Sequence, residues 1–135
     1  MTQPATCHKI QPGGTYSGKQ GFDYFEGISR ETTGAHAICM HLLTIPPGGR
    51  AKAHKHATHE TAIYVLAGTT VMYWGAQLEN RMEVNAGDMV YIPADTPHLP
   101  FNPGTTPAQA VIARTDPHEQ ESVILLPDLE ALVPA

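Results

Sequence analysis

The sequence is poor in cysteine, in charge and in long apolar runs, and each shortage excludes a class of protein. Its 135 residues include two cysteines, Cys7 and Cys39, which are too few for a disulfide framework. Only 8 Lys and Arg stand against 13 Asp and Glu, so no basic patch is expected to bind nucleic acid phosphates. The longest weakly polar run, residues 35–47, is too short and too interrupted to cross a bilayer. We therefore expect neither a nucleic acid nor a membrane partner.

The scarcity of cysteine and of long apolar runs also predicts a cytoplasmic protein, and the chain length predicts a single domain. Residues 1–10 lack the apolar segment of a secretion signal. Cys39 stands in an apolar run and is expected in the core, and Cys7 stands in a polar leader. A chain of this length is expected to fold as one domain, 1–135, with an N-terminal arm over about residues 1–20 that lies across a sheet edge.

Glycine and proline are abundant, with 12 of each, and they divide the chain into short segments. Most segments are rich in β-branched or aromatic residues and end at Gly, Pro, Asn or Asp, which predicts strands over 36–45, 61–66, 69–74, 81–84, 89–92, 109–114 and 122–126. One helical turn is expected near residues 128–132, after Pro127. This spacing predicts an all-β fold, an antiparallel β-barrel or jelly roll.

Histidine is the unusual residue of the composition, with eight copies. His54, His56 and His59 fall within six residues, and His98 follows about forty residues later. In a strand, His54 and His56 project to the same face, so both imidazoles can reach one ion. Neutral imidazole is a ligand for several transition metals, and His98 completes three ligands if its strand lies opposite. The alternative is a solvated loop that binds metal only adventitiously.

Two motifs surround these histidines. The first is Gly48-x5-His54-x-His56-x3-Glu60-x7-Gly68, and the second is Gly87-x5-Pro93-x4-His98-x3-Asn102. Together they resemble the two motifs of the cupin family, except that Asp95 stands where the family has Gly. Aspartate is among the residues that adopt left-handed conformations most readily, so this departure is tolerable. The resemblance implies a cupin jelly roll, with motifs at 48–68 and 87–102, and a homodimer.

The resemblance also implies a metal held by the two histidines of the first motif, its glutamate and the histidine of the second. The run from Glu60 to Gly68 is one residue longer than the family pattern. If the turn at Gly68 sets the strand register, Thr61 takes the place of the glutamate and faces inward with His59, while Glu60 faces outward. The ligands are then His54, His56, His59 and His98. If a bulge turns Glu60 inward, Glu60 is the fourth ligand instead.

An all-histidine site predicts the class of chemistry. Neutral ligands leave the full charge on a divalent ion, which favours anionic oxygen ligands and a lowered pKa of bound water or of an enolisable substrate. Nitrogen donors leave Fe, Zn, Ni, Mn or Cu as candidates. Glu60 is expected to act as a general base or to orient His59, and the alternative is a carboxylate at the rim that is exposed to water. Lys52 either meets a carboxylate at the pocket mouth or extends to water.

Two functions remain open from the sequence. The first is a metal-dependent enzyme acting on a small oxygenated or enolisable, anionic compound, as a dioxygenase, isomerase, cyclase or decarboxylase. The second is a noncatalytic cupin that binds or senses a small ligand. No DNA-binding helix accompanies the predicted barrel, which disfavours a regulator. Strand alternation turns Ile63 and Val65 inward, and Phe101 is close to His98 in sequence, so these residues either line the pocket or form the core of the barrel.

Overall fold

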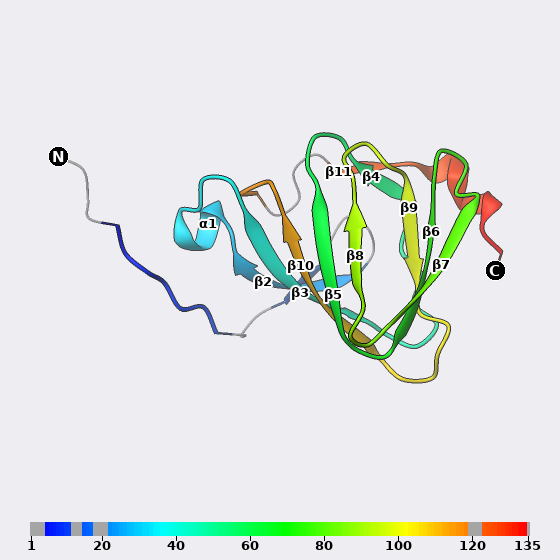
Figure 1. Ribbon diagram of the computed structural model, residues 1–135, viewed down its shortest axis with the longest axis horizontal. Coiled ribbons are helices and arrows are strands. Elements are labelled where there is room, and N and C mark those ends of the chain that lie inside the picture. The colour runs from blue at the N-terminus through cyan, green and yellow to red at the C-terminus, as the bar shows by residue number, and fades with distance from the viewer. Residues whose placement is uncertain (1–4, 12–14, 18–21, 119–122, 135) are drawn as a thin grey trace.

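A computed structural model describes residues 5–11, 15–17, 22–118 and 123–134. Within them, eleven strands alternate with short turns, and the helical content is one turn of α-helix, α1 (Arg30–Thr33), and a 3-10 helix, η1 (Pro127–Leu132). Figure 1 shows that α1 and η1 lie at opposite ends of the molecule. No described helix is long and apolar enough to span a membrane.

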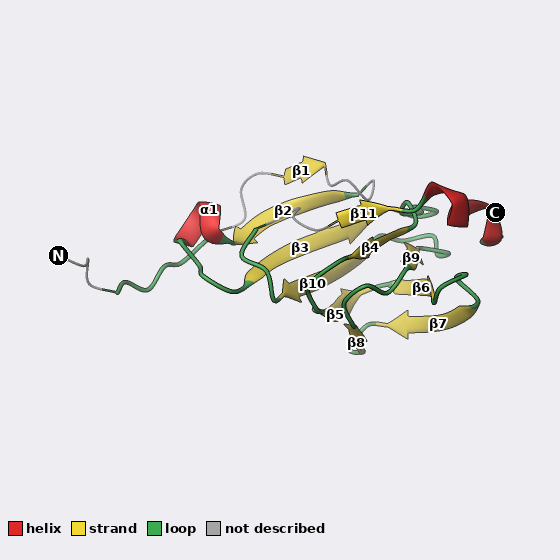
Figure 2. Ribbon diagram, turned by 90° about the horizontal axis from the view of Figure 1, so that it is seen from above, coloured by secondary structure: helices red, strands yellow, loops and turns green. Residues whose placement is uncertain are grey.

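The strands form two antiparallel sheets, which Figure 2 shows from above. The six-stranded sheet has the order β1 (Thr15–Ser17), β2 (Asp23–Ile28), β3 (Cys39–Ile45), β10 (Ala108–Arg114), β5 (Thr61–Ala67) and β8 (Met89–Ile92). The five-stranded sheet has the order β11 (Val123–Leu125), β4 (His54–His56), β9 (His98–Phe101), β6 (Thr69–Trp74) and β7 (Asn80–Asn85). This is the predicted all-β jelly roll.

Alternation along the strands places the main core between the sheets. In β3 and β10 every second side chain is buried, as expected for a sheet that packs on one face only. The buried face of the six-stranded sheet carries the larger apolar cluster, formed by Phe22, Tyr24, Leu43, Ile45, Ala51, Ala108 and Ile112 with Ile63 packed against it. This cluster makes one wall of the cavity described below.

A second apolar cluster lies on the other face of the five-stranded sheet, beneath η1. In β9 His98 and Pro100 face the core between the sheets, so Leu99 and Phe101 face the opposite way. The fully buried Leu99 packs there with Ala53, Leu78 and Val133. Of the two alternatives for Phe101, lining of the pocket is therefore wrong, because its position in β9 has the opposite parity to His98.

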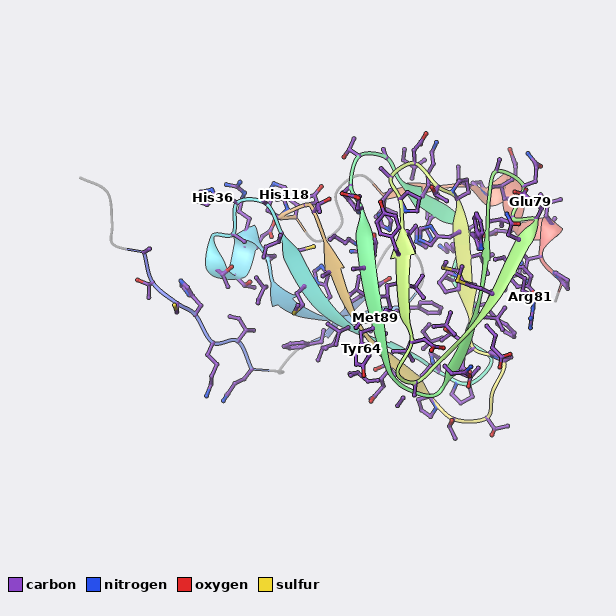
Figure 3. All side chains as sticks on the ribbon, in the orientation of Figure 1. His36, Tyr64, Glu79, Arg81, Met89 and His118 are labelled. Carbon is purple, nitrogen blue, oxygen red and sulfur yellow. The ribbon has the colours of Figure 1, made fainter. Side chains whose placement is uncertain are left out.

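The outer face of the six-stranded sheet exposes apolar side chains. Tyr64 of β5 pairs directly with Met89 of the edge strand β8, and both point outward (Figure 3). Met89 is 80% exposed, and Tyr91 and Leu66 on the same face are also exposed. These four side chains form a row of exposed apolar groups on the neighbouring strands β5 and β8.

Most predicted strands are present. Strands 69–74 and 89–92 have the predicted bounds, and the strand predicted from residue 36 begins at Cys39. Strands β2 and β9 were not predicted, because β2 contains Gly27 and two acidic residues and β9 contains Pro100. Of the predicted N-terminal arm, β1 forms a sheet edge, while residues 1–4, 12–14 and 18–20 lie outside the described residues.

Candidate metal centre

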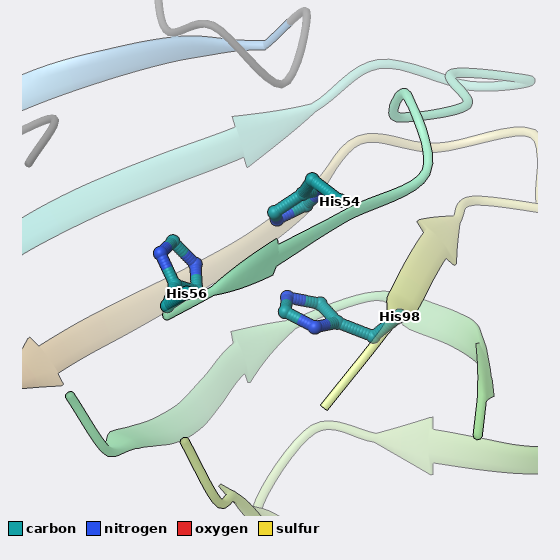
Figure 4. Close-up of side chains that lie close together, drawn as sticks. All are labelled: His54, His56 and His98. Atoms are coloured by element: carbon teal, nitrogen blue, oxygen red, sulfur yellow. The ribbon is translucent and has the colours of Figure 1, made fainter. Parts of the chain in front are cut away.

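Three imidazoles converge between the sheets, two from β4 and one from β9 (Figure 4). Alternation in β4 turns His54 and His56 to the core side and Lys55 away from it. His98 is the register partner of His54 on the neighbouring strand, and their ring centroids are 4.2 Å apart. One ligand atom from each of the three residues lies within 4.8 Å of the others, so a single ion can reach all three.

Backbone carbonyls orient two of the three rings. Nδ1 of His54 lies 2.7 Å from the carbonyl oxygen of Lys52, and Nδ1 of His98 lies 2.9 Å from that of Thr96. A carbonyl oxygen only accepts hydrogen bonds, so each Nδ1 carries the proton and each Nε2 keeps its lone pair. Metal-bound histidines in proteins are commonly fixed by such a second hydrogen bond.

Burial keeps the three imidazoles neutral. It lowers the pKa of His98 to about 4 and is also the main reason that the pKa values of His54 and His56 are lowered. The guanidinium of Arg114 lowers all three further. Neutral imidazole is the form that binds a metal, so the donor set fits a transition metal ion without prior loss of a proton.

His59 is buried beside this group. Its ring centroid is 4.5 Å from that of His56, and its Nδ1 is 3.5 Å from Oδ2 of Asp116. The ligand atoms that lie within 4.8 Å of one another come from His54, His56 and His98. Burial and Arg114 lower the pKa of His59, and the Asp116 carboxylate opposes them. Ligation by His59 stays a prediction.

The register predicted from the turn at Gly68 is confirmed. Thr61 and Val65 are buried, Ile63 is half-buried and lines the cavity, and Glu60 and Tyr64 are exposed. The alternative, a bulge that turns Glu60 inward, is therefore wrong. A carboxylate oxygen of Glu60 accepts a 2.6 Å hydrogen bond from the hydroxyl of Tyr91 on the outer face. A catalytic role for Glu60 stays a prediction.

The histidines line a cavity of about 60 Å³ between the sheets. Its walls are mostly apolar, with side chains from Leu43, Ile63, Val65, Met72, Val84, Val90, Ile92 and Ile112 among them. A largely apolar pocket with a few fixed polar groups is typical of small-ligand sites. Among the described residues of this lining, the charged side chain is that of Arg114, the last residue of β10.

The comparison with known families agrees with this geometry. The sequence model of the cupin domain matches residues 41–114, which include all four predicted ligands and Arg114. The chain belongs to the cupin family. A protein of Methanocaldococcus jannaschii described as uncharacterized is 35% identical over 83 residues, or 61% of this chain and 63% of that protein.

Solved structures show the same fold at low identity. The polyketide cyclase RemF from Streptomyces resistomycificus is 20% identical with a TM-score of 0.71, over 90% of this cupin and 86% of the cyclase. An oxalate oxidase in complex with glycolate is 22% identical with a TM-score of 0.72, over 90% and 63% of the two chains. The oxalate decarboxylase of Lactobacillus farciminis is 23% identical with a TM-score of 0.72, over 90% and 36%.

The structure explains the polar residues of both cupin motifs. Asp95 adopts a left-handed conformation with φ of 59°, as predicted for a residue in place of glycine, and it forms a 2.7 Å ion pair with Lys55. The side-chain amide of the fully buried Asn102 donates to the carbonyl oxygens of Ile45 and Thr106. Backbone hydrogen bonds also join Asn102 to Gly48 and Gly49 of the first motif.

The cation of this cupin's cavity differs from the one that the sequence suggested. Lys52 is exposed and does not line the cavity, so of its two predicted alternatives the structure supports extension to water. Among the described residues, Arg114 is the cation that lines the cavity instead, and sequence reasoning missed it. The signal was present, since Ala108, Ala110 and Ile112 alternate inward along β10 and the same parity turns Arg114 inward.

Proposed function

We propose that this cupin is a metal-dependent enzyme that acts on a small, anionic, oxygenated or enolisable organic compound. The observation that carries the proposal is the convergence of three buried, neutral imidazoles on a small apolar cavity. Its activity would be of the dioxygenase, isomerase, cyclase or decarboxylase type. The structural neighbours named as a cyclase, an oxidase and a decarboxylase support this range of chemistries. Their sequence identities of 20–23% are too low to favour one reaction over the others.

The metal would be one divalent transition ion, Fe, Zn, Ni, Mn or Cu, held by His54, His56 and His98. When bound, such an ion supplies Lewis acidity toward an oxygen of the substrate. The protein supplies neutral ligands, so the ion keeps its full charge. It also supplies a small, largely apolar cavity in which electrostatic interactions are stronger than in water. We propose His59 as the fourth ligand, with its ring oriented by Asp116.

Turnover by the metal-loaded protein tests the enzymatic proposal. Protein loaded with iron(II) would be mixed under air with a panel of small enolisable and 2-hydroxy acids, and oxygen uptake would be recorded. Parallel anaerobic samples followed by NMR would detect isomerase, cyclase or decarboxylase activity. We expect product formation with at least one compound, and its loss in a His98→Ala variant.

A noncatalytic ligand-binding or sensor role is the second candidate. The observation that favours it is that no Asp or Glu is among the described residues lining the cavity, which leaves few groups to move a proton. Tight binding of a panel compound to metal-loaded protein without any turnover would support this role and contradict the enzymatic one.

We propose further that the protein is a cytoplasmic homodimer. The exposed apolar row on the outer face of the six-stranded sheet, formed by Tyr64, Leu66, Met89 and Tyr91, supports pairing of two copies through this face.

A further inference from the structure

A second, larger cavity adjoins the one that holds the histidine triad. Its volume is about 250 Å³, against about 60 Å³ for the inner cavity. Met72 of β6 and Ile92 of β8 line both cavities, so these two side chains form the boundary between the outer cavity and the metal site. Tyr91 and Pro93 in the lining of the outer cavity are exposed, so this cavity is open to solvent. A ligand at the triad that extends past Met72 and Ile92 therefore enters the outer cavity.

The sheet register places Trp74, which lines the outer cavity, beside the triad. In the five-stranded sheet, Trp74 of β6 is the register partner of His98, and His98 is in turn the partner of His54. Thr70 and Met72 of β6 line the inner cavity, and strand alternation turns Trp74 to the same face. Residues directly opposite each other in an antiparallel pair have Cβ atoms about 4.5–5.5 Å apart. Trp74 is therefore a direct neighbour of a proposed metal ligand.

The lining of the outer cavity suits a flat, uncharged ring. Its apolar and aromatic side chains are Met72, Trp74, Met82, Tyr91, Ile92 and Pro93. None of the described residues in this lining is charged. An aromatic ring stacks favourably on an indole, and methionine sulfur makes favourable contacts with aromatic rings. The volume also exceeds the roughly 150 Å³ of a protein cavity that binds benzene. Both the lining and the volume therefore fit an aromatic ring.

We propose that the outer cavity binds an aromatic ring of the ligand, stacked on Trp74, while an oxygenated group of the same ligand reaches the histidine triad. The ligand then has two parts, an oxygenated group small enough for the inner cavity and an uncharged ring next to it. Trp74 thus favours compounds that carry a ring over compounds that carry a short alkyl group. The inference rests on the proposed function for the contact at the triad, while the contact at Trp74 is tested separately.

The test is titration of zinc-loaded protein with mandelate and with lactate. Both probes are 2-hydroxy acids, but mandelate carries a phenyl ring where lactate carries a methyl group. Calorimetry should show mandelate binding at least about tenfold more tightly than lactate, because ring stacking adds to the burial of apolar surface. Trp74 is the single tryptophan of the chain, so bound mandelate should also change the intrinsic fluorescence more than bound lactate does.

Substitutions in β6 assign the preference to Trp74. The Trp74→Leu variant should lose most of the preference for mandelate, and Trp74→Phe should keep part of it because a ring remains. Tyr73→Leu is the matched control on the same strand. Tyr73 packs in the cluster beneath η1 and is not among the described residues that line either cavity, so this variant should keep the wild-type preference.

Zinc content, measured on every sample, separates this inference from the proposed function. Equal affinity for the two probes, no mandelate binding to zinc-loaded wild-type protein, or a full preference for mandelate in Trp74→Leu would overturn the role of the outer cavity while leaving the metal site standing. Failure of the wild-type protein to bind zinc would overturn the proposed function instead. If Trp74→Leu does not fold, the comparison of the two probes on wild-type protein still decides.

Discussion

At the scale of residues, the candidate site depends on histidines that are buried in the neutral form. His98 is 3% exposed and its Nδ1–H donates to the carbonyl of Thr96, yet burial dominates and lowers its pKa to about 4. His36 is exposed and lies near α1 (Figure 3).

The metal-free protein should lose stability as the pH falls from about 6.5 to 4. In this window the unfolded chain binds a proton at residue 98, with an ordinary pKa of 6.5, and the folded chain does not, since its pKa is about 4. The stability contributed by neutral His98 is therefore present above pH 6.5 and lost toward pH 4, on the order of 3 kcal/mol for this group.

Urea denaturation at several pH values measures this effect. A His98→Gln variant should show a flatter dependence of the free energy of unfolding on pH than the wild-type protein. An unchanged slope in His98→Gln would show that this imidazole is not buried neutral in the folded protein.

Sequence reasoning found the histidines of the site but not its arginine. His54, His56 and His98 are recognisable because their spacing matches strand alternation and a known pair of motifs. Arg114 stands alone at a strand end, and its inward orientation follows only once the parity of β10 is known. The partner of His59, Asp116, was not predicted either, because the loop after β10 gives no periodic signal.

At the scale of elements, the turn between β5 and β6 decides which faces of β5 are buried. Gly68 has φ of 81°, and a Cβ there would lie 2.8 Å from Cα of Ala108 and from the carbonyl oxygen of Pro107. Only glycine adopts this left-handed conformation without strain and lacks the Cβ that would clash. The turn therefore sets the register of β5 in which Thr61 and Val65 point inward. This is why the register was predictable from the sequence, whereas β2 and β9, without a clean alternation, were not.

A Gly68→Ala variant should be destabilised by about 2–4 kcal/mol, because the left-handed conformation and the close contact both add to the cost. Gly87→Ala is the matched control, since its φ is 94° but a Cβ there meets nothing within 4 Å. The control should lose only about 1–2 kcal/mol. Thermal unfolding followed by circular dichroism gives both values, and equal losses would contradict the close packing of Gly68 against β10.

At the scale of the whole molecule, the two sheets have different outer faces. The five-stranded sheet is covered by the cluster beneath η1, whereas the six-stranded sheet leaves Tyr64, Met89 and Tyr91 exposed at its β8 edge. An uncovered apolar sheet face beside an edge strand is a common site of association. The resemblance to cupins predicted a homodimer, and this face is where we expect it to form.

Light scattering coupled to size exclusion tests the dimer. The wild-type protein should elute at twice the chain mass of 14.6 kDa, and Met89→Glu should elute as a monomer because it places a charge in the proposed interface. Ile124→Glu, at an exposed site on the other sheet, should remain a dimer. A monomeric wild-type protein, or a dimeric Met89→Glu variant, would contradict pairing through this face.

Metal content tests the central claim most directly. Untagged protein, purified without chelators and analysed by inductively coupled plasma mass spectrometry, should carry about one transition metal ion per chain. The His98→Ala variant should carry almost none, and the His36→Ala variant, altered at an exposed site near α1, should match the wild type. A wild-type protein without metal that also takes up none on reconstitution, or a His98→Ala variant that keeps a full equivalent, would contradict the assignment of His54, His56 and His98 as a metal centre.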